Sequence, residues 1–205
     1  MKQRFLLLLL LLCGFALMAC SPGVEVLQQM ACRSVLTHSP EELQPASDLV
    51  VVFTPESHEN VLKRYSDGNV QFGYTKTTGR VEEVLSGEAS AGDTIVITEE
   101  CYISDSVLWT QQGYLPMETG DSYLLFLKAY PETSKNYRGM YYPVDLEYGK
   151  YLLPAGSEAY SAAEHPAGAQ LQVGPDGDLD TYLAWYAFVQ ERYPEVFEQT
   201  NDDEF

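Results

Sequence analysis

The stretch RVEEVLSGEASAGDTIVITEE, residues 80–100, decides how this chain can fold. Residues 94–98 form a run of β-branched side chains, which predicts a strand because such side chains pack well on a pleated surface. Gly87 and Gly92 bracket a short loop before that run, as turn glycines do. Within residues 80–85 the apolar side chains lie three and four positions apart, so the local pattern leaves strand and helix both open.

Further strand signals flank this stretch on both sides. Residues 48–54, DLVVVFT, form an apolar β-branched run that is bounded by Pro55 and predicts a buried strand. Gly79 favours a kink or a bulge in the strand that contains it. The same signals predict four more strands, at residues 69–74, 122–127, 140–144 and 150–153. Short strands separated by glycine turns are typical of a mainly β fold.

These segments together resemble a known family. The succession SDLVVVF, RVEEVLSGEASAGDTIVITEE, METGDSYLLFLKAY and YYPVDLEYGKYLLP falls within residues 47–154. It is similar to small extracytoplasmic proteins with an OB-fold-like barrel, whose topology is that of the inhibitory domain of tissue inhibitors of metalloproteinases. The resemblance rests on turn glycines and strand cores, namely Gly87, Gly92, Gly120, Gly149 and the apolar runs 81–85 and 123–127. It implies a small OB-fold-like antiparallel barrel with residues 80–85 as a strand, and it implies little about activity.

The composition changes after Pro154. Residues 155–177 are rich in Ala, Gly, Ser and Pro and predict a loop that wraps the domain. Asp178 is placed to cap a helix at residues 179–192, whose apolar stripe predicts docking on the barrel or on the N-terminal region. The expected fold is therefore mainly β with a C-terminal α-helix. The expected organisation is a signal peptide (1–19), an anchor and linker with a short helix (20–46), the barrel domain (47–154), and a wrapping loop, C-terminal helix and acidic tail (155–205).

The first twenty residues indicate export. Two basic residues precede an apolar run that ends in Leu17-Met18-Ala19-Cys20, and this resembles the lipobox of a bacterial lipoprotein signal peptide. The run from Phe5 to Ala19 has fifteen residues. A spanning helix needs about 20, which favours a removed signal over an uncleaved anchor helix. We therefore expect acylation of Cys20, palmitate included, and a location on the extracytoplasmic face of the cell membrane.

The cysteines left in the mature chain form one pair. Cys13 lies in the signal peptide and Cys20 carries the lipid, so Cys32 and Cys101 remain. An even pair in an exported protein predicts a disulfide, and the alternative is two separate buried thiols. In the resembled family the amine of an N-terminal cysteine binds the protease zinc, but Cys20 is lipidated and lies 27 residues before the barrel, so this chemistry is not expected here. The three histidines are scattered, and no metal or cofactor is predicted.

The mature chain is strongly acidic. Removing the signal takes two of the 12 Lys and Arg and none of the 30 Asp and Glu, so the net charge goes from −18 to −20. Such a surface repels polyanions, which excludes nucleic acid as a partner. Most of these acids are expected only to solvate the surface.

Three acids near the C-terminal helix form a D-x-D-x-D pattern at Asp176, Asp178 and Asp180. An EF-hand loop that begins at Asp176 needs Gly at its sixth position and Glu at its twelfth, where Thr181 and Ala187 stand. A helix cap with acids near the positive end of the helix dipole is therefore favoured over calcium binding.

Aromatic side chains gather in residues 99–119 and in the later strands of a chain with 15 Tyr. Rings flanked by short polar groups suit a sugar ring or an extended peptide. A long interruption between two strands of a compact domain is also often functional. We predict a ligand face formed by Tyr102, Trp109, Tyr114, Tyr141 and Tyr142. The alternative is that these rings pack the core and rim of the barrel.

No catalytic motif is present: the chain lacks Gly-x-Ser-x-Gly, His-Glu-x-x-His and the P-loop lysine motif. The expected function is a non-catalytic, lipid-anchored binding module of the bacterial envelope, with a protein, peptide or glycan as ligand. The alternative is an envelope hydrolase that acts on cell-wall glycan through acidic residues. Two carboxyls about 5–10 Å apart across a groove would favour the hydrolase, and an aromatic shelf without them would favour binding.

Overall fold

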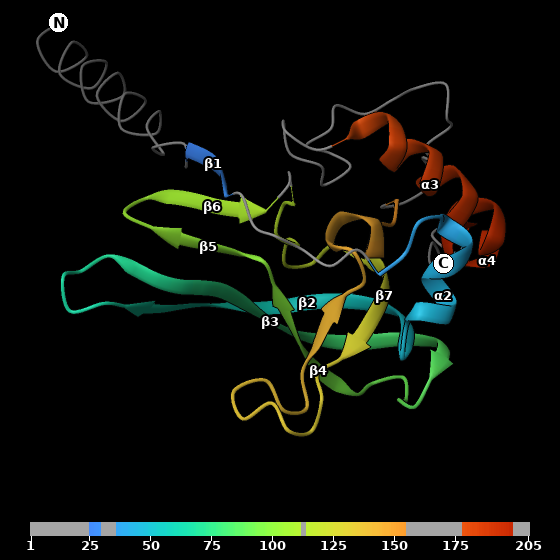
Figure 1. The fold of residues 1–205 in the computed structure, drawn as a ribbon. Helices are drawn as coiled ribbons and strands as arrows, with labels where there is room; N and C mark the ends of the chain where they lie inside the picture. The colour runs from blue at the N-terminus through green and yellow to red at the C-terminus, as the bar shows by residue number, and fades with distance from the viewer. Residues whose placement is uncertain (1–24, 30–35, 112–113, 155–177, 199–205) are drawn as a thin grey trace, which may run out of the picture.

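The computed structural model describes residues 25–29, 36–111, 114–154 and 178–198 (Figure 1). As predicted, the fold is mainly β with a C-terminal helix. The strands are β1 (Glu25–Gln29), β2 (Leu49–Arg64), β3 (Val70–Gly87), β4 (Thr94–Glu99), β5 (Cys101–Ser104), β6 (Val107–Gln111), β7 (Tyr123–Ala129), β8 (Tyr141–Pro143) and β9 (Lys150–Leu152). The helical segments are η1 (Pro40–Glu42), α2 (Leu43–Ala46), η2 (Leu146–Gly149), α3 (Leu179–Arg192) and α4 (Pro194–Glu198).

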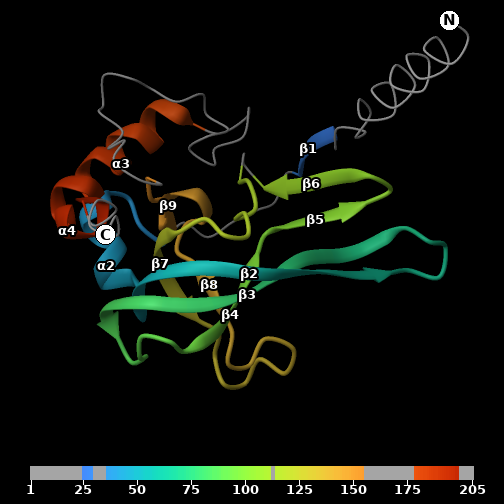
Figure 2. The same cartoon turned by 180° about the vertical axis from the view of Figure 1, so that it is seen from behind.

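Five strands close into a ring in the order β2-β3-β4-β8-β7, because β7 pairs back with β2. Neighbouring strands are antiparallel except β4 and β8, which are parallel and pair through Ile97 and Tyr141. β9 pairs with residues 123–125 of β7, on the same side of β7 as β8, which pairs with residues 127–129. A separate three-stranded sheet has the order β1-β6-β5 and lies beside the long β2–β3 hairpin (Figures 1 and 2).

Alternation along the strands supplies two apolar clusters, one on each face of the ring. On β7, Leu125 and Leu127 face the interior, where they pack with Phe53 and Val81. The intervening Phe126 faces outward and packs against the helices. Because successive side chains of a strand point to opposite faces, β7 is buried on both faces, and this explains its continuous apolar sequence.

Helix α3 covers the exposed edge of β9. The hydroxyl of Tyr182 donates to the Lys150 carbonyl at 2.9 Å, and that of Tyr186 donates to the Leu152 carbonyl at 3.2 Å. These contacts satisfy backbone acceptors that an edge strand leaves open. The predicted cap is also confirmed, because the Asp178 carboxylate accepts from the Thr181 amide at 3.0 Å. In the described part of the chain, no helix combines the length and the apolar character that crossing a membrane requires.

The β2–β3 hairpin is longer than the sequence predicted. Pro55 was expected to end the first strand, and this was wrong, because β2 continues through it to Arg64. Pro55 has no N–H to donate, and the strand accommodates it with a register shift between Pro55 and Ser57, opposite Gly79. The extra residue is Glu56 of β2, so this bulge lies in the strand opposite Gly79 and not in the strand that contains it. Residues 80–85 are a strand, as the resemblance implied.

The aromatic stretch after β4 folds as the β5–β6 hairpin. Its turn residues Asp105 and Ser106 both have positive φ, 55° and 66°, as a tight two-residue hairpin turn requires. The hairpin packs on β3 at Gly73, where a Cβ would meet the Tyr102 ring at 2.5 Å. Glycine at this position therefore lets the two sheets approach closely.

Candidate functional site

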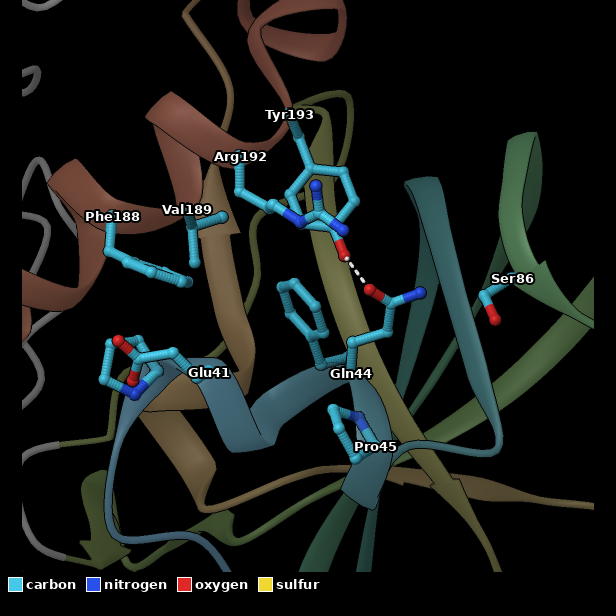
Figure 3. A pocket seen from close by; sticks show the side chains of 10 residues that line it. Glu41, Gln44, Pro45, Ser86, Phe188, Val189, Arg192 and Tyr193 are labelled. Atoms are coloured by element: carbon cyan, nitrogen blue, oxygen red, sulfur yellow. Dashed lines mark hydrogen bonds between the residues drawn. The ribbon is translucent and has the colours of Figure 1, made fainter.

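An open pocket of about 540 Å³ lies where η1 and α2 meet the end of α3 (Figure 3). Two distant parts of the chain form its walls, with the ends of β3 and β7 between them. Its lining residues are Pro40, Glu41, Gln44, Pro45, Ser86, Phe126, Phe188, Val189, Arg192 and Tyr193. The size matches that of small-ligand and peptide side-chain sites.

Local sequence signals position the walls. Pro40 is the first residue of η1, and Pro194 follows directly after α3 and Tyr193. The Tyr193 hydroxyl donates to the Gln44 Oε1 atom at 3.0 Å, which ties together segments 149 residues apart. Burial raises the pKa of Tyr193, so this phenol is neutral and donates at neutral pH.

The pocket combines an apolar wall with two opposite charges. Phe188 supplies the accessible apolar surface, and Val189 and Phe126 are buried behind it. Hydrogen bonding to the Ser39 side chain lowers the pKa of Glu41, so this carboxyl is ionised at neutral pH. No ion pair within 4.0 Å joins Glu41 to Arg192, so each charge faces the pocket without neutralising the other.

This arrangement suits binding better than bond cleavage. Apolar walls take an apolar side chain, while a guanidinium, a carboxylate and the Gln44 amide offer polar partners to groups beside it. Among the residues that line the pocket, Glu41 is the single carboxylate. Acid–base hydrolysis of a glycoside needs two.

The aromatic residues predicted as one ligand face are divided among different places. Tyr102 and Trp109 stack, with ring centroids 6.3 Å apart, on the face of β3 that carries Gly73. Tyr114 is fully buried, and its hydroxyl donates to Glu99 at 2.6 Å. Because a buried ring reaches no ligand, Tyr114 does not belong to a surface shared with Trp109.

Tyr141 and Tyr142 lie on β8 and alternate between its faces. Tyr141 packs against the interior cluster of the ring. Tyr142 packs on Tyr130, with ring centroids 4.8 Å apart, at the end of an aromatic row. From Tyr142 the row continues to β3, with each ring packed on the next: Tyr142, Tyr130, Tyr137, Tyr74 and Phe72. Tyr74 and Phe72 point away from the face on which Gly73 meets Tyr102, so the row and the Tyr102–Trp109 pair lie on opposite faces.

A buried polar cluster joins the ring to the β5–β6 hairpin. Glu99 is fully buried and accepts hydrogen bonds from Thr77, Tyr114 and the Met117 amide. Lys150 is also fully buried, donates to the Leu115 carbonyl and lies 4.1 Å from the centre of the Tyr114 ring. Burial lowers the pKa of Lys150 to about 8, against the opposing charge of Glu99. Because Glu99, Lys150 and Tyr114 are all fully buried, this cluster is part of the core.

Of the three cysteines in these predictions, the structure describes only Cys101. Cys20 and Cys32 lie outside the described residues. Cys101 is a buried thiol whose Sγ lies 3.8 Å from the Thr75 hydroxyl, and burial raises its pKa. The Cys32–Cys101 disulfide and the lipid on Cys20 therefore stay predictions. Intact mass after alkylation of the denatured protein, with and without reductant, decides the disulfide.

The acidic triplet also falls partly outside the described residues. Asp176 is not described, and Asp178 serves as the cap of α3. Within the described ranges no group of three or more His, Cys, Asp or Glu side chains is arranged to hold a metal ion.

Sequence reasoning missed the pocket residues. Arg192 was predicted only as the last residue of a docking helix, Tyr193 had no predicted role, and Gln44 was placed in a linker with a short helix. One signal was available: Phe188 is apolar but lies outside the stripe of Leu179, Tyr182, Leu183, Tyr186 and Val189. An apolar residue beside the docking stripe indicates a second surface for the same helix.

No model of a known protein family matches this chain, and no curated protein matches it significantly.

Proposed function

We propose that this protein is a non-catalytic, lipid-anchored binding module on the extracytoplasmic face of a bacterial cell membrane. The observation that carries the proposal is the open pocket between α2 and α3, with its apolar wall and its separated Glu41 and Arg192 charges. The lipobox at residues 17–20 supports the location. A tether raises the effective concentration of a binder at the envelope without any need for turnover.

The scaffold is inferred to be an OB-fold-like barrel similar to the inhibitory domain of tissue inhibitors of metalloproteinases. Support comes from the five-stranded ring with its parallel β4–β8 pair, and from the turn glycines named above. Proteins with this scaffold commonly bind ligands through loops and segments at the rim of the strands. The pocket lies at such a rim, next to Ser86 at the end of β3.

The ligand chemistry that fits is a peptide segment of an envelope protein. An apolar side chain of the ligand would pack on Phe188, and the Gln44 amide would bond its backbone. A peptide also carries charged groups of both signs, which Arg192 and Glu41 complement. A glycan is the competing ligand, and the aromatic row over β3 is the surface that suits it.

The hydrolase alternative has no observation in its favour. Glu41 is the one carboxylate of the pocket lining, and Glu99 is buried with its oxygens engaged by three donors. Neither acid is placed as half of a catalytic pair across a groove.

Site-specific crosslinking in living cells tests the proposal. A photoreactive phenylalanine replaces Phe188 in the pocket and, as a matched control, Asn136, which is exposed in the connection between β7 and β8. We expect an adduct to one envelope protein from position 188, lost when Arg192→Ala is added and kept when the exposed Arg138→Ala is added instead. Equal adducts at both positions, or none at 188, would show that the pocket is not the binding site.

A further inference from the structure

Apolar side chains are exposed mainly at one end of the molecule. Among the described residues, four large apolar side chains are exposed, and three of them, Tyr65 (55 %), Phe72 (38 %) and Ile103 (46 %), lie on the two hairpins. We name this region the hairpin end: residues 60–74 of the β2–β3 hairpin together with residues 103–107 of the β5–β6 hairpin. Exposed apolar groups gathered in one region indicate a contact surface.

The two hairpins have their tips at the same end. Asn60 donates to the Ile103 carbonyl at 2.8 Å and accepts from the Ile103 amide at 2.7 Å. Arg64 donates to the Ser104 hydroxyl at 2.8 Å. Both views show the hairpins extending together, away from α3 and α4 (Figures 1 and 2).

The charge of the hairpin end differs from that of the rest of the chain. Residues 60–74 carry two cations, Lys63 and Arg64, and one acid, Asp67, and Asp105 is the only acid in residues 103–107. The hairpin end is therefore neutral, in a mature chain of net charge −20. Lys63 lies over the Phe72 ring, 5.6 Å from its centre, so a cation and an exposed aromatic ring form one unit.

The lipid anchor is attached close to this end. β1 runs parallel to β6, with its first residue, Glu25, paired with Val107 directly after the β5–β6 turn. Glu25 lies five positions after Cys20, and a fully extended chain of that length reaches at most about 17 Å. An acylated Cys20 therefore holds Glu25 within that distance of the membrane surface, with the β5–β6 turn next to it.

We infer that the hairpin end is a membrane-contacting surface, which rests on the lipid anchor of the proposed function. Tyr65 and Phe72 at the tip of the β2–β3 hairpin enter the headgroup region of the bilayer that holds the anchor. Lys63 and Arg64 reach the lipid phosphates, since aromatic rings and long basic side chains are the usual residues at this depth. A neutral surface avoids the repulsion that the remaining acidic surface meets at anionic headgroups.

This contact would orient the whole molecule. The pocket residue Ser86 lies opposite Val50, at the other end of the hairpin from Arg64. Fourteen positions of β2 separate Val50 from Arg64, and at about 3.3 Å per residue they span about 45 Å. The hairpin would hold the pocket away from the membrane, open to envelope partners.

Fluorescence quenching in vesicles tests the inference. The full chain is produced as a lipoprotein and reconstituted into phosphatidylethanolamine–phosphatidylglycerol vesicles, with and without a lipid brominated along its acyl chains. One protein carries Tyr65→Trp with Trp109→Phe and Trp185→Phe, and the matched control keeps Trp185 and carries only Trp109→Phe. We expect the brominated lipid to remove most of the emission of the indole at position 65 and none from Trp185, which packs against Tyr148 beside α3. Circular dichroism and melting temperature confirm that both proteins fold.

The possible outcomes distinguish a failure of this inference from a failure of the predicted lipid anchor. A mass without acyl chains on Cys20 would show that the anchor is wrong. The same short tether is then made by coupling Cys20 of the Cys32→Ser variant to a maleimide lipid, and the two indoles are measured again. Anchored protein in which position 65 is not quenched, or in which both indoles are quenched equally, would overturn the inference. A blue-shifted but unquenched indole at position 65 would also overturn it, because a second protein copy would then cover the tip.

Discussion

The pocket end and the hairpin end of this molecule are held together by different forces. At the pocket end, α2, α3 and α4 bury a continuous apolar cluster against the outer face of the sheet. At the hairpin end, β2 pairs with β7 only as far as Phe53, and β3 meets β4 only from Thr75 onward. Beyond those points the two strands pair with each other and are supported by the β5–β6 hairpin. Burial thus dominates one end, and backbone pairing with a few polar contacts dominates the other, so equivalent substitutions should have very unequal effects.

The largest difference is expected from removing an aromatic ring at each end. Tyr182 is fully buried between α3 and β9, and Tyr182→Ala should lower the free energy of unfolding by about 3–5 kcal/mol through lost burial and a cavity. Phe72→Ala at the exposed hairpin should cost less than about 1 kcal/mol. Denaturant unfolding of both variants measures the difference. Similar losses in the two variants would contradict the contrast between the ends.

A second contrast concerns two lysines and pH. The pKa of buried Lys150 is about 8 in the folded protein. In the unfolded chain it returns to about 10.4, so between these values the unfolded state binds more protons and stability rises with pH. As the pH rises from 8 to 10, the unfolding free energy of the wild type should therefore increase by about 1 kcal/mol per pH unit relative to that of Lys150→Met.

Exposed Lys63 provides the control for this effect. Lys63→Met is measured over the same pH range to control for the loss of one lysine side chain. Other groups titrate in this window, including the buried tyrosines, but they are common to all three proteins and cancel in the differences. If the Lys150→Met curve runs parallel to the wild type, Lys150 is not desolvated as the structure has it.

The elements with one clear local signal could be predicted from the sequence. Residues 94–98 and 122–127 have continuous β-branched or apolar runs and are strands, and residues 179–192 have a cap and a helical stripe and are a helix. Residues 80–85 did not give a clear strand signal, and the pairing register of β2 with β3 shows why. Phe53 pairs with Val81 and Val52 with Glu83, so Glu82 is an extra residue in β3 that shifts the alternation. A bulge therefore gave a strand the apolar spacing of a helix.

The β5–β6 hairpin and the pocket could not be predicted, for different reasons. The hairpin turn is Asp105-Ser106, both with positive φ, where the recognisable sequence signal would be Asn-Gly or Asp-Gly. The pocket depends on contact between Gln44 and Tyr193, which no local pattern relates. The predicted aromatic face failed to form as one surface because alternation sends Tyr141 and Tyr142 to opposite sides of β8.

The smallest expected effect on stability tests how the hairpin end is joined. Asn60 acts as a bridging residue, because its side-chain amide makes two hydrogen bonds to the backbone of Ile103. Both bonds are exposed to water, so Asn60→Ala should cost only about 0.5 kcal/mol of global stability. The Ile103 amide, however, loses its acceptor and should exchange with solvent much faster. Tyr193→Phe is the matched change at the pocket end, where it removes the hydrogen bond to Gln44 at a similar cost. It should leave the exchange of Ile103 unchanged, because the buried helices and not the hairpins hold that end. Faster exchange at Ile103 in both variants would mean that the two ends open together, and the division of the molecule into a packed end and a paired end would then be wrong.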